Sequence, residues 1–374
     1  MTPVAIVFWL AAGLLVYTQL GYPLALWLLT RPRREEEVVD PADPPMVSMI
    51  VAARDERASI AGWVDSALAL EYPRERLEVL VVSDGSVDGT AEAAERAGAD
   101  VVLEVEPHGK VAALNAGVAR ARGDVFAFAD ANARWDPGAL RRLVARLGAD
   151  RVGYVCGQLR LVGGDGSNQE GLYWRYEMAV RSLESRLGGV TAGNGAINAV
   201  RREAYVELEP TRGQDISLPY ELTKRGWRAA YEPGAIAEEP MAANLGSEVG
   251  RKRRMLTGAW ATLLRHGMLS PRGYTPAYAF EIYSHRLLRY ASPILHLIAL
   301  AANIALVGEG PLYVVALALQ IALLAGAALA FVVPLRPFQI ARYYVAVTAA
   351  SALGLWDYLR RGVPTTWDKA EGTR

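Results

Sequence analysis

Acidic and amide side chains stand where an apolar run of the sequence ends, in the stretch VFAFADANARWDP at residues 125–137. Asp130 and Asn132 are two residues apart, and in an extended chain such side chains lie on the same face. Their oxygen atoms are hard ligands of the kind that Mg²⁺ and Mn²⁺ prefer, and these ions often complete their shells with phosphate oxygens. The pair therefore predicts a metal site that would neutralise a departing diphosphate.

Three other apolar runs nearby also end in polar residues. Arg54 and Glu56 follow the first run, Asp84 opens a Gly-rich turn after the second, and Lys110 comes shortly after the third. Each end has a plainer interpretation as a turn or a helix cap, and such roles are compatible with function. Four polar ends in a row indicate a single polar site.

Strand and helix patterns alternate through this part of the chain, with short connections between them. Apolar, β-branched runs predict strands, and amphipathic stretches ending in Gly predict helices. The predicted strands are 47–52, 77–83, 101–105 and 124–130, and the predicted helices are 57–70, 88–98, 109–123 and 136–148. This alternation predicts an α/β fold, a parallel sheet covered by helices on both faces. Such sheets bind ligands beyond the carboxyl ends of their strands.

The order of these motifs resembles that of inverting glycosyltransferases of family two, which have the GT-A fold. The resemblance runs from about residue 45 to 265 and implies a doubly wound, mostly parallel sheet. The stretches that carry it are AARDE (52–56), VVSDGSVDGT (81–90), HGKVAALNAG (108–117), FADANA (128–133), GNGAINAVRREAY (193–205) and GQDISLPYELTKRGWRAAYEPGA (213–235).

The resemblance also implies which residues would bind the nucleotide-sugar donor. Glu56 and Asp84 would contact the base and the ribose, with Arg54 beside them, and Lys110 would act at the donor. Asp130 with Asn132 corresponds to the metal motif, although many members have a second Asp where this chain has Asn132.

Asp215 stands where the family keeps its catalytic base. A carboxylate within hydrogen-bond reach can take the proton that an acceptor hydroxyl loses as it attacks the sugar. The residue before it is usually acidic in the family, and here it is Gln214. Judged from the residues alone, Asp215 is also a candidate N-cap for the helix that follows it.

A basic run, Arg251 to Arg254, stands where processive members carry Gln-x-x-Arg-Trp. Arg251 and Arg254 could hold a diphosphate by bidentate bonds, which predicts a donor clamp; a solvated basic face is the alternative. Met255 replaces the Trp, so a stacking surface for the acceptor sugar is missing and the case for processive extension is weaker.

Long uncharged segments flank the predicted catalytic domain. Residues 4–29 span about 39 Å as a helix, enough for an apolar bilayer core of about 30 Å. The charged run RPRREEE that follows, at 31–37, favours the cytoplasmic side. Uncharged runs recur at 290–308 and 310–335, whereas 343–356 reaches only about 21 Å, so whether it spans is left open. The predicted division is a membrane helix (1–30), a GT-A domain (45–265), an interfacial helix (269–288) and about three C-terminal membrane segments (289–360).

These features predict a multi-pass glycosyltransferase of the bacterial inner membrane with a cytoplasmic active site. It would use Mg²⁺ or Mn²⁺ to move a sugar from a nucleotide sugar, expected to be a UDP-sugar, to a lipid-linked or polysaccharide acceptor. A membrane-anchored nucleotidyltransferase and a non-catalytic membrane assembly subunit remain as alternatives. The net charge of zero, with 40 basic and 40 acidic residues, argues against a nucleic-acid partner.

Overall fold

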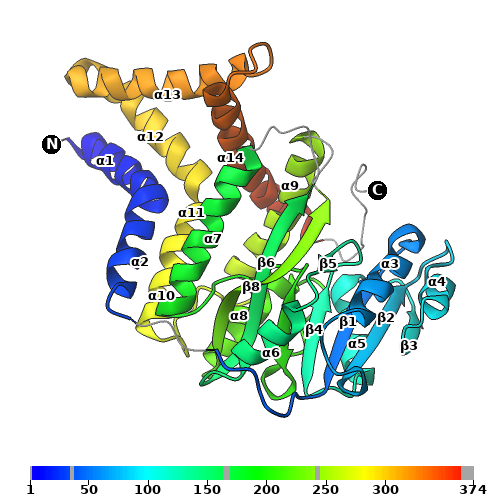
Figure 1. Ribbon diagram of the computed structural model, residues 1–374. Coiled ribbons are helices and arrows are strands. Elements are labelled where there is room, and N and C mark those ends of the chain that lie inside the picture. Colours follow the sequence, from blue (N-terminus) through cyan, green and yellow to red (C-terminus); the bar gives the residue numbers. More distant parts are fainter. Residues whose placement is uncertain (1, 34–37, 163–168, 241–244, 364–374) are drawn as a thin grey trace.

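A sheet-containing body and a group of apolar helices make up the protein (Figure 1). The computed structural model describes residues 2–33, 38–162, 169–240 and 245–363. Part of the charged run 31–37 therefore lies outside the described residues.

The described residues form an eight-stranded sheet with the order β3-β2-β1-β4-β7-β6-β8-β5. Strands β1 to β4 run parallel to one another, β7 is antiparallel to both of its neighbours, and β6 and β8 are parallel. This confirms the predicted α/β class with a mostly parallel sheet. The strands are β1 Val47–Ala53, β2 Leu77–Asp84, β3 Val101–Val105, β4 Val125–Ala129, β5 Arg134–Trp135, β6 Val152–Val162, β7 Asn198–Arg201 and β8 Arg228–Pro240.

Both faces of the sheet are covered by helices because its strands are apolar on both sides. In β1, Met49 and Val51 pack on one face, and Ile50 and Ala52 pack on the other. The first face carries α3 (Arg57–Leu68), α4 (Thr90–Arg96) and α6 (Ala139–Leu147). The second carries α5 (Lys110–Arg120), α7 (Gln169–Leu187) and α8 (Gln214–Lys224). This double burial explains the continuous apolar runs in the sequence.

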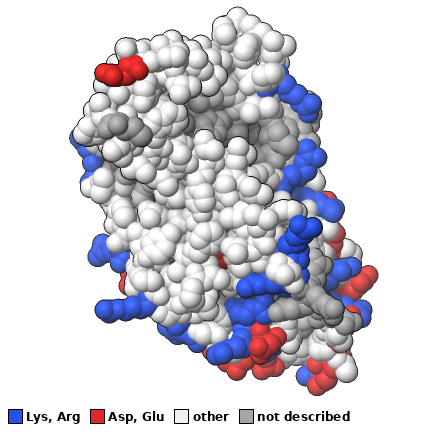
Figure 2. Space-filling view, turned by 90° about the vertical axis from the view of Figure 1, so that its left-hand side faces the viewer, with Lys and Arg blue, Asp and Glu red and all other residues white. Residues whose placement is uncertain are grey.

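Within the described residues, three helical segments are long and apolar enough to cross a membrane: Pro3–Thr30, Ser292–Glu309 and Pro311–Leu329. The first is interrupted by a π-helical turn, Tyr17–Gly21, between α1 (Pro3–Val16) and α2 (Tyr22–Thr30). The others contain α12 (Ser292–Leu306) and α13 (Pro311–Leu329), and α1 packs on α12 through Ala5, Phe8 and Ala302. Figure 2 shows a broad uncharged surface on this side, with charged residues gathered toward the lower end.

The short uncharged run 343–356 lies inside α14 (Arg336–Arg361), which is not among the three candidate spans. Instead, α14 packs on α9 (Leu245–Leu264) of the sheet-containing body. Arg253 of α9 forms two bonds of 2.5 and 2.7 Å with Asp357, and the Trp260 indole donates to the Ser351 carbonyl at 3.0 Å. Two C-terminal candidate spans are therefore found where about three were predicted.

The segment predicted to be an interfacial helix, 269–288, contains α10 (Pro276–Glu281) and a π-helical turn (Ile282–Leu287). It continues into α11 (Leu288–Tyr290). Tyr278, Glu281 and Ile282 are fully buried against the sheet-containing body. This segment links the sheet-containing body to the C-terminal apolar helices, and its place at a lipid surface stays a prediction.

Candidate active site

The loops after β1 and β2 are bound to each other at the carboxyl edge of the sheet. The backbone amide of Glu56 donates to the Thr90 hydroxyl at 2.8 Å, and that of Asp55 donates to the Ser86 hydroxyl at 3.0 Å. In return, the Val87 amide donates to the Asp55 carboxylate at 2.9 Å. The half-buried Arg54 and Glu56 therefore lie beside the Gly-rich turn, as the motif order predicts, and their contact with a nucleotide stays a prediction.

Asp84 is fully buried at the end of β2. Its carboxylate accepts bonds from the backbone amides of His108 and Gly109, each at 3.0 Å. Gly109 has φ +94°, a conformation that favours glycine, and Lys110 begins α5 immediately after it. Asp84 therefore fixes the loop that presents Lys110, and its predicted contact with the nucleotide stays a prediction.

Lys110 forms an ion pair with Asp130, which follows β4. Burial lowers the pKa of Lys110, but the carboxylates of Asp130, Asp215 and Glu239 outweigh it and the net shift of the pKa is upward. Lys110 therefore carries its charge at neutral pH. Gly195 backs onto this pair, because a Cβ there would lie 3.1 Å from Asp130 Oδ2 and 3.2 Å from Lys110 Nζ. Asn132 is half-buried on the same loop as Asp130.

Asp215 lies in the first turn of α8, and the helix is capped by Gly213. The position of Asp215 rules out the N-cap interpretation. Its backbone carbonyl accepts a bond of 2.8 Å from the amide of Gly193, so the 193–195 loop touches both Asp215 and Asp130. Burial and the nearby Asp130 raise the pKa of Asp215, whereas Lys110 opposes the shift. A raised pKa strengthens a carboxylate as a general base.

Glu239 joins this group, although the sequence reasoning missed it. The antiparallel pairing of Arg134 with Glu238 places the end of β8 beside the loop that carries Asp130. The Glu239 side chain is buried, and its Oε1 has no hydrogen-bond partner. Burial and the like charge of Asp130 raise the pKa of Glu239 to about 8. The available signal was an acidic strand end, Glu238-Glu239-Pro240, of the same kind as the other four.

The two arginines predicted to clamp the donor differ in position on α9. Arg251 bonds to Glu248 at 3.0 Å and lies close enough to lower the pKa of Glu239, which puts it near the cluster. Arg254 is exposed. The structure thus brings Lys110, Asp130, Asp215 and Arg251 together, while a role for Arg254 at the same site stays a prediction.

The donor atoms at this site fit a divalent cation only in part. Among the described residues, no three acids, histidines or cysteines converge as a ready-made metal site. The carboxyl groups of Asp130 and Glu239 nevertheless lie side by side, and Glu239 has an orphaned buried oxygen, which a cation between them would satisfy. Such a cation would need further oxygen ligands, and substrate phosphates commonly supply these to Mg²⁺ and Mn²⁺.

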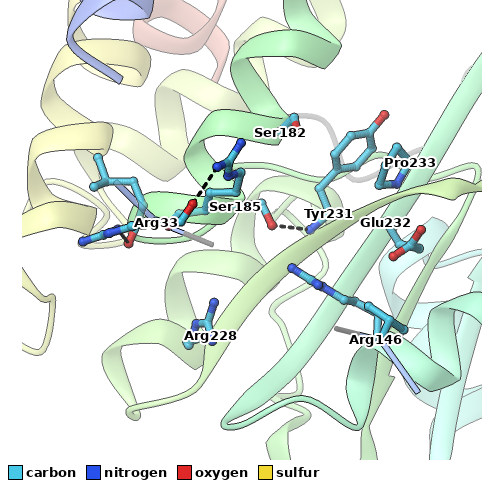
Figure 3. Close-up of a pocket in the computed structure, with 11 residues that line it drawn as sticks. Arg33, Arg146, Ser182, Ser185, Arg228, Tyr231, Glu232 and Pro233 are labelled. Atoms are coloured by element: carbon cyan, nitrogen blue, oxygen red, sulfur yellow. Dashed lines mark hydrogen bonds between the residues drawn. The ribbon is translucent and has the colours of Figure 1, made fainter. Parts of the chain in front are cut away.

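A cavity of about 550 Å³ lies elsewhere, between α7, β8 and the chain that leaves α2 (Figure 3). Four arginines line it, together with serines, Tyr231 and Glu232; they are Arg33, Arg146, Arg186 and Arg228. Inside it, the Tyr231 amide donates to the Ser185 hydroxyl at 2.9 Å. None of the predicted site residues lines this cavity, so it is separate from the candidate active site.

The arrangement of sheet, helices and polar strand ends is that of a GT-A glycosyltransferase. Residues 48–208 match the family "Glycosyl transferase family 2". The chain therefore carries a glycosyl transferase family 2 domain, which confirms the family indicated by the sequence motifs.

Two curated relatives are similar to more than half of the chain. The β-monoglucosyldiacylglycerol synthase of a Nostoc species is 29% identical over 228 residues, which cover 56% of this chain and 48% of the relative. The poly-β-1,6-N-acetyl-D-glucosamine synthase of Staphylococcus aureus is 26% identical over 231 residues, which cover 59% and 56%. The chain thus spans about half the length of these relatives.

One solved structure is similar over nearly the whole chain. It is the mannosyltransferase PcManGT from Pyrobaculum calidifontis, in complex with GDP-mannose and Mn²⁺. The TM-score is 0.73 at 24% identity, and the match covers 95% of this chain and 99% of that one. The apolar helices that flank the GT-A domain are therefore part of a shared fold.

Proposed function

We propose that the protein is a membrane glycosyltransferase that moves a sugar, with inversion, from a nucleotide sugar to a lipid-linked or polysaccharide acceptor. The observation that carries this proposal is the convergence of Lys110, Asp130 and Asp215 at the carboxyl edge of a family 2 sheet. An acid of raised pKa lies there beside a fixed cation, which suits the removal of a proton next to a phosphate-bearing donor.

Asp215 acts as the general base in this proposal. Its carboxylate takes the proton of the acceptor hydroxyl as that oxygen attacks the anomeric carbon of the donor sugar. The bond from the sugar to the diphosphate breaks on the opposite face, so a single displacement inverts the anomeric centre. The bond from the Gly193 amide to the Asp215 carbonyl holds the first turn of α8 in place for this step.

Lys110 and Arg251 provide positive charge for the diphosphate of the donor. Both side chains lie around Asp130 and Glu239, where charge on the leaving group would be stabilised. Asp130, with Asn132 and Glu239, would hold a divalent cation together with phosphate oxygens of the donor, and that ion would supply charge neutralisation of the leaving diphosphate. Arg54, Glu56 and the turn after Asp84 would bind the nucleoside.

The three apolar helical segments support a membrane location and a membrane-bound acceptor. The names of the two curated relatives describe a glycolipid synthase and a polysaccharide synthase, which fits either class of acceptor. The basic residues that follow the first apolar helix favour a cytoplasmic active site at a bacterial inner membrane.

A turnover assay tests the proposal against its alternatives. The full chain, reconstituted in phospholipid nanodiscs, is mixed with Mn²⁺ and with UDP-glucose, UDP-N-acetylglucosamine or GDP-mannose in turn. Release of a nucleoside diphosphate that depends on added lipid extract supports a glycosyltransferase. Release of pyrophosphate with a nucleoside triphosphate would indicate a nucleotidyltransferase, and the absence of both turnover and nucleotide binding would indicate a non-catalytic subunit.

A further inference from the structure

Helix α7 lies between α2, the second half of the first apolar helix, and strand β8 of the sheet (Figure 1). On the side of α2, Tyr22 and Leu26 pack against Val180 in one buried cluster. The Tyr176 hydroxyl donates to the carbonyl of Gln19 at 3.1 Å. One face of α7 is therefore fixed to the membrane helix.

The ends of α2 and α7 also hold each other. Arg33, just after α2, donates to the carbonyls of Arg186 and Leu187 at 2.9 and 2.6 Å. Arg186 of α7 donates in return to the carbonyl of Arg33 at 2.9 Å, and both side chains line the cavity in Figure 3. These bonds satisfy carbonyls at both helix ends, so the two helices are coupled along their length.

Glu184 is the buried centre of this junction. Its side chain is fully buried on α7, and its carboxylate accepts a bond of 2.7 Å from the Tyr22 hydroxyl. The same carboxylate accepts bonds from the Thr191 hydroxyl, the shorter of them 3.2 Å, and lies 2.6 Å from His285 Nδ1. Through this single carboxylate, α7 is joined to the first membrane helix and to the segment around Thr191.

The proton positions at His285 follow from its other partner. Arg289 lies 2.8 Å from His285 Nε2 and can only donate, so Nε2 accepts and Nδ1 donates to Glu184. Burial alone would raise the pKa of Glu184, but the hydrogen bonds from His285 and Tyr22 and the positive charge of Arg286 outweigh it and hold the pKa well below its usual range. Glu184 is therefore a charged and well-satisfied acceptor, which makes its hydrogen bonds strong.

Thr191 connects Glu184 to the active site through hydrogen bonds. Its hydroxyl oxygen accepts a bond of 2.7 Å from Arg286, and two residues later the Gly193 amide binds the Asp215 carbonyl at 2.8 Å. Arg181 of α7 donates to the Gly193 carbonyl at 3.2 Å. The segment 191–193 is thus held by α7 on one side and holds the backbone of Asp215 on the other.

Two π-helical turns in the described part of the chain flank this junction, Tyr17–Gly21 and Ile282–Leu287. The Tyr17 hydroxyl lies 2.8 Å from the Ser284 hydroxyl and joins the two turns without contacting Glu184. π-Helical turns are frequent at functional sites. Here the second turn carries His285 and Arg286 into the network.

We propose that the first membrane helix positions the base Asp215 through the chain Tyr22–Glu184–Thr191–Gly193, so that seating of this helix sets the rate of transfer. Tyr22, Glu184 and Thr191 are positioning residues in this proposal. It rests on the proposed function for the role of Asp215, whereas the mechanical coupling from Tyr22 to Asp215 can be measured without turnover.

The first experiment compares Tyr22→Phe with Tyr17→Phe in full-length protein in phospholipid nanodiscs. Both variants remove one hydroxyl from the same membrane helix, but only Tyr22 contacts Glu184. Hydrogen exchange by mass spectrometry is expected to be about tenfold faster at 190–196 and 213–217 in Tyr22→Phe, as one lost bond to a charged group predicts. Tyr17→Phe is expected to match the wild type there. Equal exchange in the wild type and Tyr22→Phe would overturn the coupling.

The second experiment measures turnover of the nucleotide sugar that the wild type consumes. Tyr22→Phe is expected to lower kcat about tenfold with an unchanged donor KM, because the base and not the donor site is displaced. A kcat equal to that of the wild type, in a preparation in which the enzyme is active, refutes the inference and leaves the proposed function standing. Absence of turnover in the wild type counts against the proposed function, and the exchange data then decide the coupling alone.

A matched pair at Thr191 separates positioning from simple loss of stability. Thr191→Ser keeps the hydroxyl, and Thr191→Val keeps the shape and removes the hydroxyl. The serine variant is expected to retain kcat within about twofold, and the valine variant is expected to lose about tenfold or more in kcat with unchanged UDP binding in Mn²⁺ by calorimetry. Equal kcat values in the two variants would contradict the inference.

Discussion

The acidic side chains around Asp130 and those around Glu184 are two clusters in opposite electrostatic conditions. At the candidate active site, Asp130, Asp215 and Glu239 share the charge of Lys110, and the pKa values of Asp215 and Glu239 are raised. At the junction with the first apolar helix, hydroxyls, an imidazole and a guanidinium surround Glu184, and its pKa is lowered.

The difference indicates what each cluster does. A buried carboxylate whose lone pairs are all satisfied is stable as the anion and fixes the elements around it. Carboxyl groups that are crowded together with too few hydrogen-bond partners destabilise one another's charged forms, and binding of a proton, a cation or a substrate would reduce this destabilisation. Such clusters are typical of functional sites. The two clusters are only a few hydrogen bonds apart, through Thr191 and Gly193.

The largest expected effect on turnover comes from a substitution in the cluster around Asp130. Asp215→Asn keeps the shape and removes the base, so kcat is expected to fall by about 10²–10⁴-fold while UDP binding in Mn²⁺ is retained. Calorimetry with UDP and a coupled nucleoside-diphosphate assay measure the two quantities. Asp65→Asn, at an exposed position of α3, is the control. A near-normal kcat in Asp215→Asn would refute its assignment as the base.

A substitution in the cluster around Glu184 is expected to lower the stability of the protein. Glu184→Ala removes the acceptor of Tyr22, Thr191 and His285 and takes away a negative charge near the buried Arg286. Each buried donor that is left unsatisfied costs about 1–3 kcal/mol, so thermal unfolding should begin at a clearly lower temperature. Asp215→Asn should leave the melting temperature close to that of the wild type. A Glu184→Ala protein with the same melting temperature as the wild type would contradict the structural role of the Glu184 cluster.

Asp130→Ala tests whether the cluster around Asp130 binds a divalent cation together with the donor. The variant is expected to lose about tenfold to a hundredfold in Mn²⁺-dependent UDP affinity, because a charged oxygen ligand is lost. UDP affinity without Mn²⁺ should change much less. Isothermal titrations in Mn²⁺ and in EDTA provide the comparison, and an unchanged affinity in Mn²⁺ would count against the metal site.

The smallest expected effect is a shift in the pH profile. Asp215 must be deprotonated to act as a base, so kcat should fall as the pH drops through its raised pKa, above the value of about 3.9 for a free Asp. Lys110 lowers the pKa of Asp215, and Lys110→Met should therefore move this acid limb to higher pH at saturating donor. A limb that stays in place or moves to lower pH would show that Lys110 does not act on the base.

Much of the catalytic half could be predicted because its signals are local. The strands β1, β2, β3 and β4 lie where apolar runs predict them, and Asp84, Lys110 and Asp130 lie at their carboxyl edge. Glu239 was missed because its neighbour Asp130 is more than one hundred positions earlier, and only the pairing of β5 with β8 joins them. Apolarity alone left open whether 343–356 spans a membrane, because the contact that fixes α14 to α9, the ion pair of Arg253 with Asp357, joins residues about one hundred positions apart.

The sequence by itself determined the parallel sheet and the apolar segments, since these depend on the period and composition of short stretches, and the order of its motifs indicated the family by resemblance. Only the tertiary structure decided which acids share a cation and which are fully satisfied, because the pKa of a carboxylate depends on distant groups brought close by folding. Glu184 and Glu239 are both buried glutamates, and burial raises the pKa of each; only at Glu184 do the neighbouring groups outweigh burial and lower the pKa.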